Sequence, residues 1–202
     1  EAGVKAILKR SVKDIAEREA DDLARRLAPV TDQKVVQQEL EAFAKSKQVA
    51  QGDKIYHQST QKGLPTFDAF FGSEKFQKTF PQEFGKELTE AVLPKNAKVL
   101  NLDLATKEGR EFMSEAAKRA FPNDIKFQKD LINKPSITSG IDEVSGQSLA
   151  EDFYSEVWVS KVHAVDVLKN PKFSDYDAVI FKDEVLIPKK TLPKLKSVQE
   201  YT

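Results

Sequence analysis

The chain has 202 residues, with 32 Lys and Arg against 32 Asp and Glu, so its formal net charge is zero, and it contains no cysteine. The lack of cysteine excludes disulfides, thiolate nucleophiles and cysteine-ligated clusters. With two histidines we expect no zinc site and assign no metal ligands, although an ion held by Asp, Glu and water, such as Mg²⁺, stays open. The balanced charge differs from the basic surplus of a general nucleic-acid binder. Because no apolar run reaches the roughly 18 residues that a membrane span needs, no membrane association is expected.

Residues 1–52 are predicted to be helical. Apolar residues recur at three- and four-residue spacing over residues 4–27, which predicts an amphipathic helix that ends at Pro29. Thr31 and Asp32 can cap a second helix, so we expect a helical hairpin. The apolar positions are Val4, Leu8, Val12, Ile15, Leu23 and Leu27 in the first helix and Val35, Val36, Leu40 and Phe43 in the second.

Residues 53–202 are predicted to form one α+β domain. Lys54–Ser59 alternates and is rich in β-formers, which predicts a strand. The Phe-rich segment 66–84 is expected to fold into short helices with its aromatic rings in the core. Pro81 to Leu93 is expected to be a helix, with the proline in its first turn.

The rest of the chain is predicted to contain strands separated by helices of unequal length, which favours α+β over a regular βαβ alternation. A strand around residues 157–165 is an alternative to a helix there. In order, we expect a strand at Ala97–Leu104, a helix from Thr106 to Phe121, a helix or turn from Pro122, a loop over 133–148, a long helix over Leu149–Leu168, and a closing hairpin of Tyr176–Phe181 with Val185–Ile187.

Two segments can carry chemistry, since no phosphate-binding glycine loop and no nucleophile elbow is present. The first is Ile55–Thr60. A histidine on a strand beside hydroxyl side chains can present ring N–H and hydroxyl groups to a ribose or an amide. The alternative is a half-exposed strand histidine that bonds a backbone carbonyl.

The second segment is Tyr176–Pro188, in which Asp183 and Glu184 stand between two apolar strands. A carboxylate at the end of a buried strand can accept sugar hydroxyls or stabilise an oxocarbenium-like centre. The alternative is that Lys182, Asp183 and Glu184 form an ordinary polar hairpin turn.

Together the two segments resemble the ADP-ribosyltransferase-like superfamily, and most closely its versions in bacterial polymorphic toxins and phage polyvalent proteins. Tyr56-His57-Gln58-Ser59-Thr60 is similar to the first strand of that family. Residues 176–188 are similar to the family's C-terminal segment, in which a Glu precedes an apolar strand. Phe67-Asp68 and the strand at 99–102 are similar as well. The resemblance covers residues 54–198.

The resemblance implies a split β-sheet with a cleft for NAD, which is consumed as a substrate. It places Tyr56, His57, Gln58, Ser59 and Thr60 at the NAD site. His57 and Glu184 are the implied catalytic residues. His57 would contact the nicotinamide ribose, and Glu184 would bond the ribose hydroxyl and stabilise the oxocarbenium-like state as nicotinamide leaves.

The implied biological role is that of an effector or toxin domain that transfers ADP-ribose to a macromolecular target, a protein. The first ten residues show no signal-peptide core. We therefore expect the chain in the cytoplasm, or delivered into a host cell by a phage or by secretion. The sequence leaves the oligomeric state open.

Two other functions stay open. Gln58 replaces a glycine of the family, and the family's glycine-flanked aromatic segment is not found, which favours a non-enzymatic interaction or virion-structural protein that keeps a degenerate version of the fold. The other is a small RNase toxin with His57 or His163 as its base, against which the neutral charge counts.

Overall fold

The computed structural model describes residues 25, 27–30, 32–45, 52–78, 85–139, 141 and 144–195. The first helix of the expected hairpin, residues 4–27, lies almost entirely outside this set. The chain divides into two compact units, one of residues 1–45 with 102–174 and one of residues 46–101 with 175–202. The predicted domains, 1–52 and 53–202, stay a prediction.

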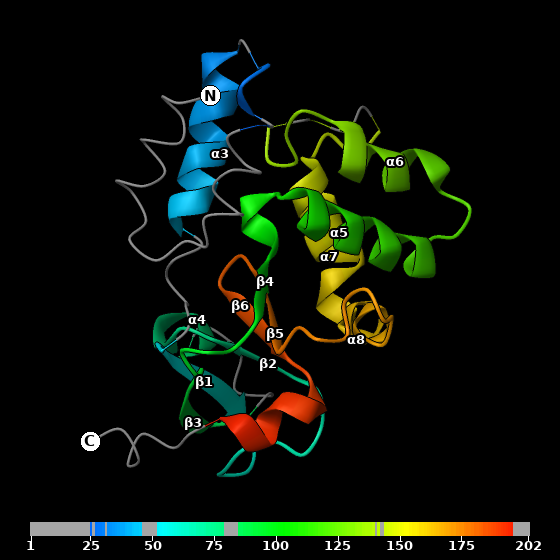
Figure 1. The fold of residues 1–202 in the computed structure, drawn as a ribbon. Coiled ribbons are helices and arrows are strands. Elements are labelled where there is room, and N and C mark those ends of the chain that lie inside the picture. Colours follow the sequence, from blue (N-terminus) through cyan, green and yellow to red (C-terminus); the bar gives the residue numbers. More distant parts are fainter. Residues whose placement is uncertain are drawn as a thin grey trace. The chain divides into compact units, whose positions relative to one another are not determined.

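The first unit, the helical unit, contains helices and no strand among its described residues (Figure 1). Asp32 Oδ1 accepts a hydrogen bond from the Lys34 N–H at the start of α3, and Thr106 caps α5 by accepting one from the Gly109 N–H at 3.1 Å. The elements are α3 Gln33–Lys45, η3 Leu102–Leu104, α5 Lys107–Ala120, α6 Ile125–Asn133, α7 Leu149–Glu156, η4 Trp158–Ser160 and α8 Val162–Leu168.

The long helix predicted over Leu149–Leu168 is wrong, and so is the alternative strand there. The segment forms α7, the short turn η4 and α8, and Lys161 between η4 and α8 has a left-handed φ of 48°. Val157 and Trp158 are both fully buried. Apolar spacing continues across the break, so periodicity alone does not reveal it.

The second unit, the sheet unit, contains a six-stranded sheet in the order β3-β1-β2-β6-β5-β4 (Figure 1). The pairs are antiparallel except β4 with β5, which are parallel. The predicted α+β class is thus confirmed. The elements are β1 Lys54–Ser59, β2 Ala69–Gly72, α4 Glu74–Lys78, β3 Glu87–Val92, β4 Val99–Asn101, β5 Ala178–Phe181, β6 Glu184–Ile187 and η5 Lys189–Lys194.

Two expected helical regions contain strands instead. The Phe-rich region includes β2, and the helix expected at Pro81–Leu93 is wrong over Glu87–Val92, which is β3. Both predictions failed because the strands depend on distant partners: β3 pairs with β1 at six consecutive positions. In β2, Ala69, Phe71 and Gly72 are all buried, so the apolar pattern of a one-sided strand is missing.

One buried apolar cluster of the sheet unit lies on one face of the sheet, and Val179, Phe181 and Leu186 are buried on the opposite face of β5 and β6. Because residues directly opposite each other on neighbouring strands share a face, the strand pairs place Ile55, Phe71 and Val185 together on this core face. The buried cluster also contains Ala69, Ala91, Leu93, Ala97, Ala178, Ile180, Ile187, Leu192 and Leu195. None of the described helices is long and apolar enough to cross a membrane.

Candidate functional site

The sheet brings the two chemistry-bearing segments close together. β1 carries Tyr56–Ser59 and β6 begins with Glu184, and β2 is the strand between them. Tyr56 is opposite Gly72, and Gly72 is opposite Glu184. Two steps of strand spacing separate Tyr56 from Glu184, which corresponds to about 10 Å between their backbones.

The same register separates the two residues that were predicted to act together. Tyr56, Gly72 and Glu184 share the opposite face, which we call the polar face and which also carries the buried Phe181 and Leu186. His57 belongs to the core face. The His57 ring packs against Phe71, with ring centroids 5.1 Å apart. Its Nδ1 lies 2.8 Å from the Phe70 carbonyl oxygen. The structure therefore shows His57 bonded to a backbone carbonyl, and its contact with a ribose stays a prediction.

Glu184 is the first residue of β6 and is only 4% exposed. It lies in the strand rather than in the hairpin turn, and Lys182, with a φ of 54°, takes the left-handed conformation that reverses the chain before it. Glu184 is flanked by Gly72 on β2 and by Phe181 on β5. A carboxylate held in this way can act more strongly on a nearby positive charge than an exposed one.

The sheet opens between β1 and β2. These strands pair only at Tyr56 and Gly72 within the described residues. In a continuous antiparallel ladder, the backbone of Gln58 would bond the backbone of Phe70. Instead, the Gln58 N–H donates to Gln77 Oε1 at 3.1 Å, and the Phe70 carbonyl faces the His57 ring. Two side chains thus occupy positions that strand pairing leaves vacant.

Gln77 on α4 is part of this opening, and it was not among the predicted site residues. It is 3% exposed. A Cβ built on Gly72 would lie 3.2 Å from Gln77 Nε2, which places the Gln77 amide on the polar face. Nothing in the local pattern distinguishes this glutamine, because its position depends on the way α4 packs on β1.

One buried amide atom of each of these two glutamines has no hydrogen-bond partner: Gln77 Nε2, a donor, and Gln58 Oε1, an acceptor. Gln58 Nε2 donates to the Gly85 carbonyl at 2.6 Å, which fixes the orientation of that side chain. Buried polar atoms without partners are rare in folded proteins, and they commonly mark a place for water or a ligand.

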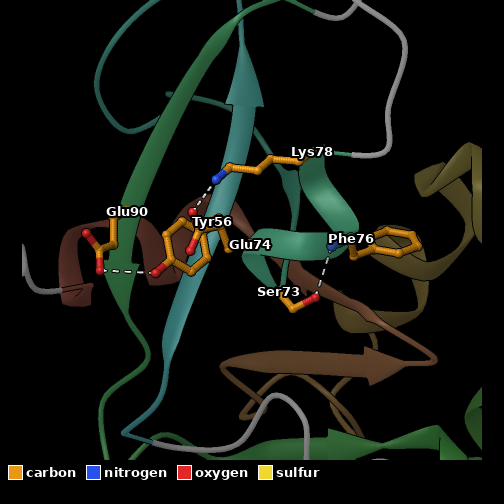
Figure 2. Close-up of polar contacts among 6 residues, drawn as sticks. All are labelled: Tyr56, Ser73, Glu74, Phe76, Lys78 and Glu90. Carbon is orange, nitrogen blue, oxygen red and sulfur yellow. Dashed lines mark hydrogen bonds and ion pairs between the residues drawn. The ribbon is translucent and has the colours of Figure 1, made fainter.

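Tyr56 lies on the polar face but is directed toward β3. Its hydroxyl donates to Glu90 Oε1 at 3.2 Å, and Figure 2 shows Glu74, ion-paired with Lys78, on the side of the ring toward α4. Burial raises the pKa of the Tyr56 phenol, and the negative charges of Glu90 and then Glu74 raise it further. The phenol is therefore a hydrogen-bond donor at neutral pH.

The other predicted binding residues lie at the end of β1. The Ser59 hydroxyl accepts a hydrogen bond from the Gln61 N–H, and Thr60 is exposed just beyond the strand. Asp68, from the similar Phe-Asp pair, accepts a hydrogen bond from the Lys189 N–H at 2.8 Å. His163 lies on α8 in the helical unit.

A hollow in the sheet unit is lined by none of the predicted site residues. It has a volume of about 540 Å³ and is lined by Pro94, Lys95, Asn96, Ala97, Asp177, Thr191 and Lys194. Across the described part of the chain, no cluster of three or more histidine and acidic side chains is placed to hold a metal ion.

Comparison with known proteins gives no match to a family model, to a curated protein or to a solved structure.

Proposed function

We propose that the sheet unit binds NAD at the opening between β1 and β2 and transfers ADP-ribose to a protein. The observation that carries this proposal is the row Tyr56–Gly72–Glu184, which runs across three adjacent strands. The two segments that resemble ADP-ribosyltransferases are far apart in the sequence, and the activity requires them to meet. Tyr56 of the first segment and Glu184 of the second share one face of the sheet, and Gly72, which has no side chain, lies between them.

Glu184 is the residue proposed to act on the reacting centre. As the bond between ribose C1′ and the nicotinamide nitrogen breaks, its electron pair leaves with nicotinamide and positive charge develops on the ribose ring. The Glu184 carboxylate would accept a hydrogen bond from a ribose hydroxyl and oppose that charge. A nucleophilic atom of the target would then form the new bond to C1′ and lose its proton.

His57 has a different part in this proposal from the one implied by the resemblance. With its ring on the core face and its Nδ1 at the Phe70 carbonyl, it maintains the separation of β1 from β2. A group that contacts the reacting ribose has to lie within hydrogen-bond reach of it. Tyr56 and Gln58 lie on the polar face with Glu184, so they are the residues of β1 proposed to contact the ribose.

The test is the release of nicotinamide from NAD by the full chain, with and without a protein lysate as the acceptor. Glu184→Gln keeps the shape of the side chain and should lower the rate by about 10²- to 10³-fold, the usual cost of removing a preorganised stabilising group. Glu87→Gln, the same substitution at the start of β3, is the matched control and should leave the rate unchanged. Equal rates in wild type and Glu184→Gln would contradict the proposal.

The second candidate is a non-enzymatic interaction protein that keeps this sheet. It is favoured by one observation, the placement of His57 and Glu184 on opposite faces. Under this alternative, the chain would not bind NAD at millimolar concentration. Glu184→Gln would then change the stability of the sheet, and no chain would release nicotinamide.

A further inference from the structure

The opening between β1 and β2 already holds a carboxamide. The Gln58 N–H, which the strand ladder leaves free, donates to the amide oxygen of Gln77. A backbone N–H at the end of a ladder can bond many kinds of acceptor, but the acceptor found here is the planar amide of a side chain that is 3% exposed. The structure thus shows a primary carboxamide seated in this opening.

Gln77 is an imperfect occupant of that position. Its oxygen is bonded, but its Nε2 has no acceptor, and Gln58 Oε1 has no donor. Gln58 cannot rotate freely to correct this, because its Nε2 is held by the Gly85 carbonyl. A buried donor and a buried acceptor that remain unpaired both oppose this arrangement. A carboxamide whose nitrogen also finds an acceptor would bond the Gln58 N–H without this cost.

The helix that carries Gln77 is short and is organised by contacts within itself. The Phe76 N–H donates to the Ser73 hydroxyl at 3.2 Å, and Lys78 forms an ion pair with Glu74, as Figure 2 shows. These contacts hold α4 together, while the Phe76 ring lies against β2, since a Cβ built on Gly72 would lie 3.1 Å from Phe76 Cδ1. The bond from Gln58 to Gln77, by contrast, joins α4 to β1. Releasing that bond would free the Gln77 side chain without breaking α4.

We infer that Gln77 is an internal ligand that closes the opening, and that a primary carboxamide such as the nicotinamide end of NAD binds by displacing it. The oxygen of the ligand amide then accepts from the Gln58 N–H in place of Gln77 Oε1. This inference rests on the proposed function for the identity of the ligand. It adds that in the wild-type chain the Gln77 side chain occupies the ligand's position until the ligand displaces it.

The test is calorimetric titration of nicotinamide and of NAD into the full-length wild type and Gln77→Ala. Removing the competing amide should lower the dissociation constant for nicotinamide by about tenfold or more. Gln61→Ala, at an exposed glutamine beyond β1, is the matched control and should bind as the wild type does. If Gln77→Ala disrupts folding, as judged by circular dichroism, Gln77→Ser takes its place.

Hydrogen exchange at the Gln58 amide gives a second readout. Its protection should fall in Gln77→Ala and return when nicotinamide is added. Equal or weaker nicotinamide binding by a folded Gln77→Ala chain would overturn the inference, because Gln77 would then not compete with the ligand.

The two proposals fail in different ways. If wild type and Gln77→Ala bind NAD equally and Glu184→Gln still abolishes nicotinamide release, the proposed function stands and the internal ligand is overturned. If Gln77→Ala gains nicotinamide affinity but no chain releases nicotinamide from NAD, the carboxamide site stands and ADP-ribosyl transfer is overturned. If neither chain binds nicotinamide or NAD, both are overturned.

Discussion

The two edges of β2 differ in how they are paired. Along one edge, β2 pairs with β6 at four successive positions, from Ala69 with Ile187 to Gly72 with Glu184. Along the other edge, it meets β1 only at Gly72 with Tyr56. The first edge is a complete ladder between buried strands. At the second edge, the ladder ends and side chains bond the backbone groups that it leaves.

This difference shows where a sheet of this kind has backbone groups that a ligand could bond. A complete ladder satisfies every backbone group and leaves nothing to bind a ligand. Where the ladder stops, N–H and C=O groups need other partners, and here His57 and Gln77 supply them. Among the described strands, the opening is therefore where we propose that a ligand competes for bonds that the fold makes through side chains.

The largest effect is expected at Gly72, the residue that both edges share. A Cβ at this position would lie 2.7 Å from the Asp183 carbonyl oxygen, a backbone atom of the hairpin turn. Gly72→Ala should therefore lower the free energy of unfolding by about 3 kcal/mol, since the turn or β2 has to shift. Urea denaturation measures this. A loss below about 1 kcal/mol would mean that the hairpin turn shifts at little cost and that the packing around Gly72, between Tyr56 and Glu184, is not rigid.

The next effect is expected at His57, which lies on the open edge. His57→Ala removes the contact with Phe71 and the ring nitrogen at the Phe70 carbonyl. We expect a loss of about 1–2 kcal/mol in the free energy of unfolding. If His57 instead contacted the ribose, the substitution would abolish nicotinamide release and leave the stability nearly unchanged. Denaturation and turnover measured on the same preparation separate the two roles.

A smaller effect is expected far from the opening, at Asp177 before β5. Burial acts to raise the pKa of its carboxyl, but the hydrogen bonds from Lys194 and from the Lys98 N–H outweigh it, and the pKa is lowered. A lowered folded-state pKa contributes stability above the ordinary carboxyl pKa and loses it as the pH falls further. Wild type should lose stability below about pH 4.

Asp177→Asn removes the carboxylate without changing the size of the side chain. It should lower the free energy of unfolding by about 1 kcal/mol at neutral pH and should flatten the acid dependence in denaturation curves between about pH 5 and pH 2. It should not change nicotinamide binding, so any effect on binding would argue against placing the site at the opening.

The smallest effect is expected at Tyr56. Tyr56→Phe removes the hydrogen bond to Glu90 and should cost about 0.5 kcal/mol at neutral pH. Because the folded-state pKa of the phenol is raised, the wild type should lose stability as the pH rises above about 10, while the unfolded chain ionises first. Melting temperatures between about pH 9 and pH 11 should fall less steeply for Tyr56→Phe. Parallel slopes would contradict the placement of the phenol between the two carboxylates.

Local patterns in the sequence predicted some elements well. Alternation gave β1, the apolar run gave β5 with β6 as its hairpin partner, and Thr106 was confirmed as the cap of α5. The two missed strands have a common cause, since their stabilising partners are distant in the sequence. β2 is buried on both faces and β3 is defined by its pairing with β1.

The candidate site was predictable only in part, for a similar reason. The sequence identified Glu184 and the β1 segment, but it could not give the register that puts Glu184 beside Gly72 and sends His57 to the other face. Gln77 had no recognisable pattern at all. Its importance comes from a single contact with the backbone of β1, which only the folded chain reveals.

The proposed NAD site is best tested by calorimetric titration of NAD into three chains: wild type, Glu184→Gln and Gln77→Ala. If the site exists, NAD should bind wild type weakly, Gln77→Ala about tenfold more tightly, and Glu184→Gln more weakly than wild type. Identical isotherms for the three folded chains, or no binding to any of them at millimolar NAD, would contradict it.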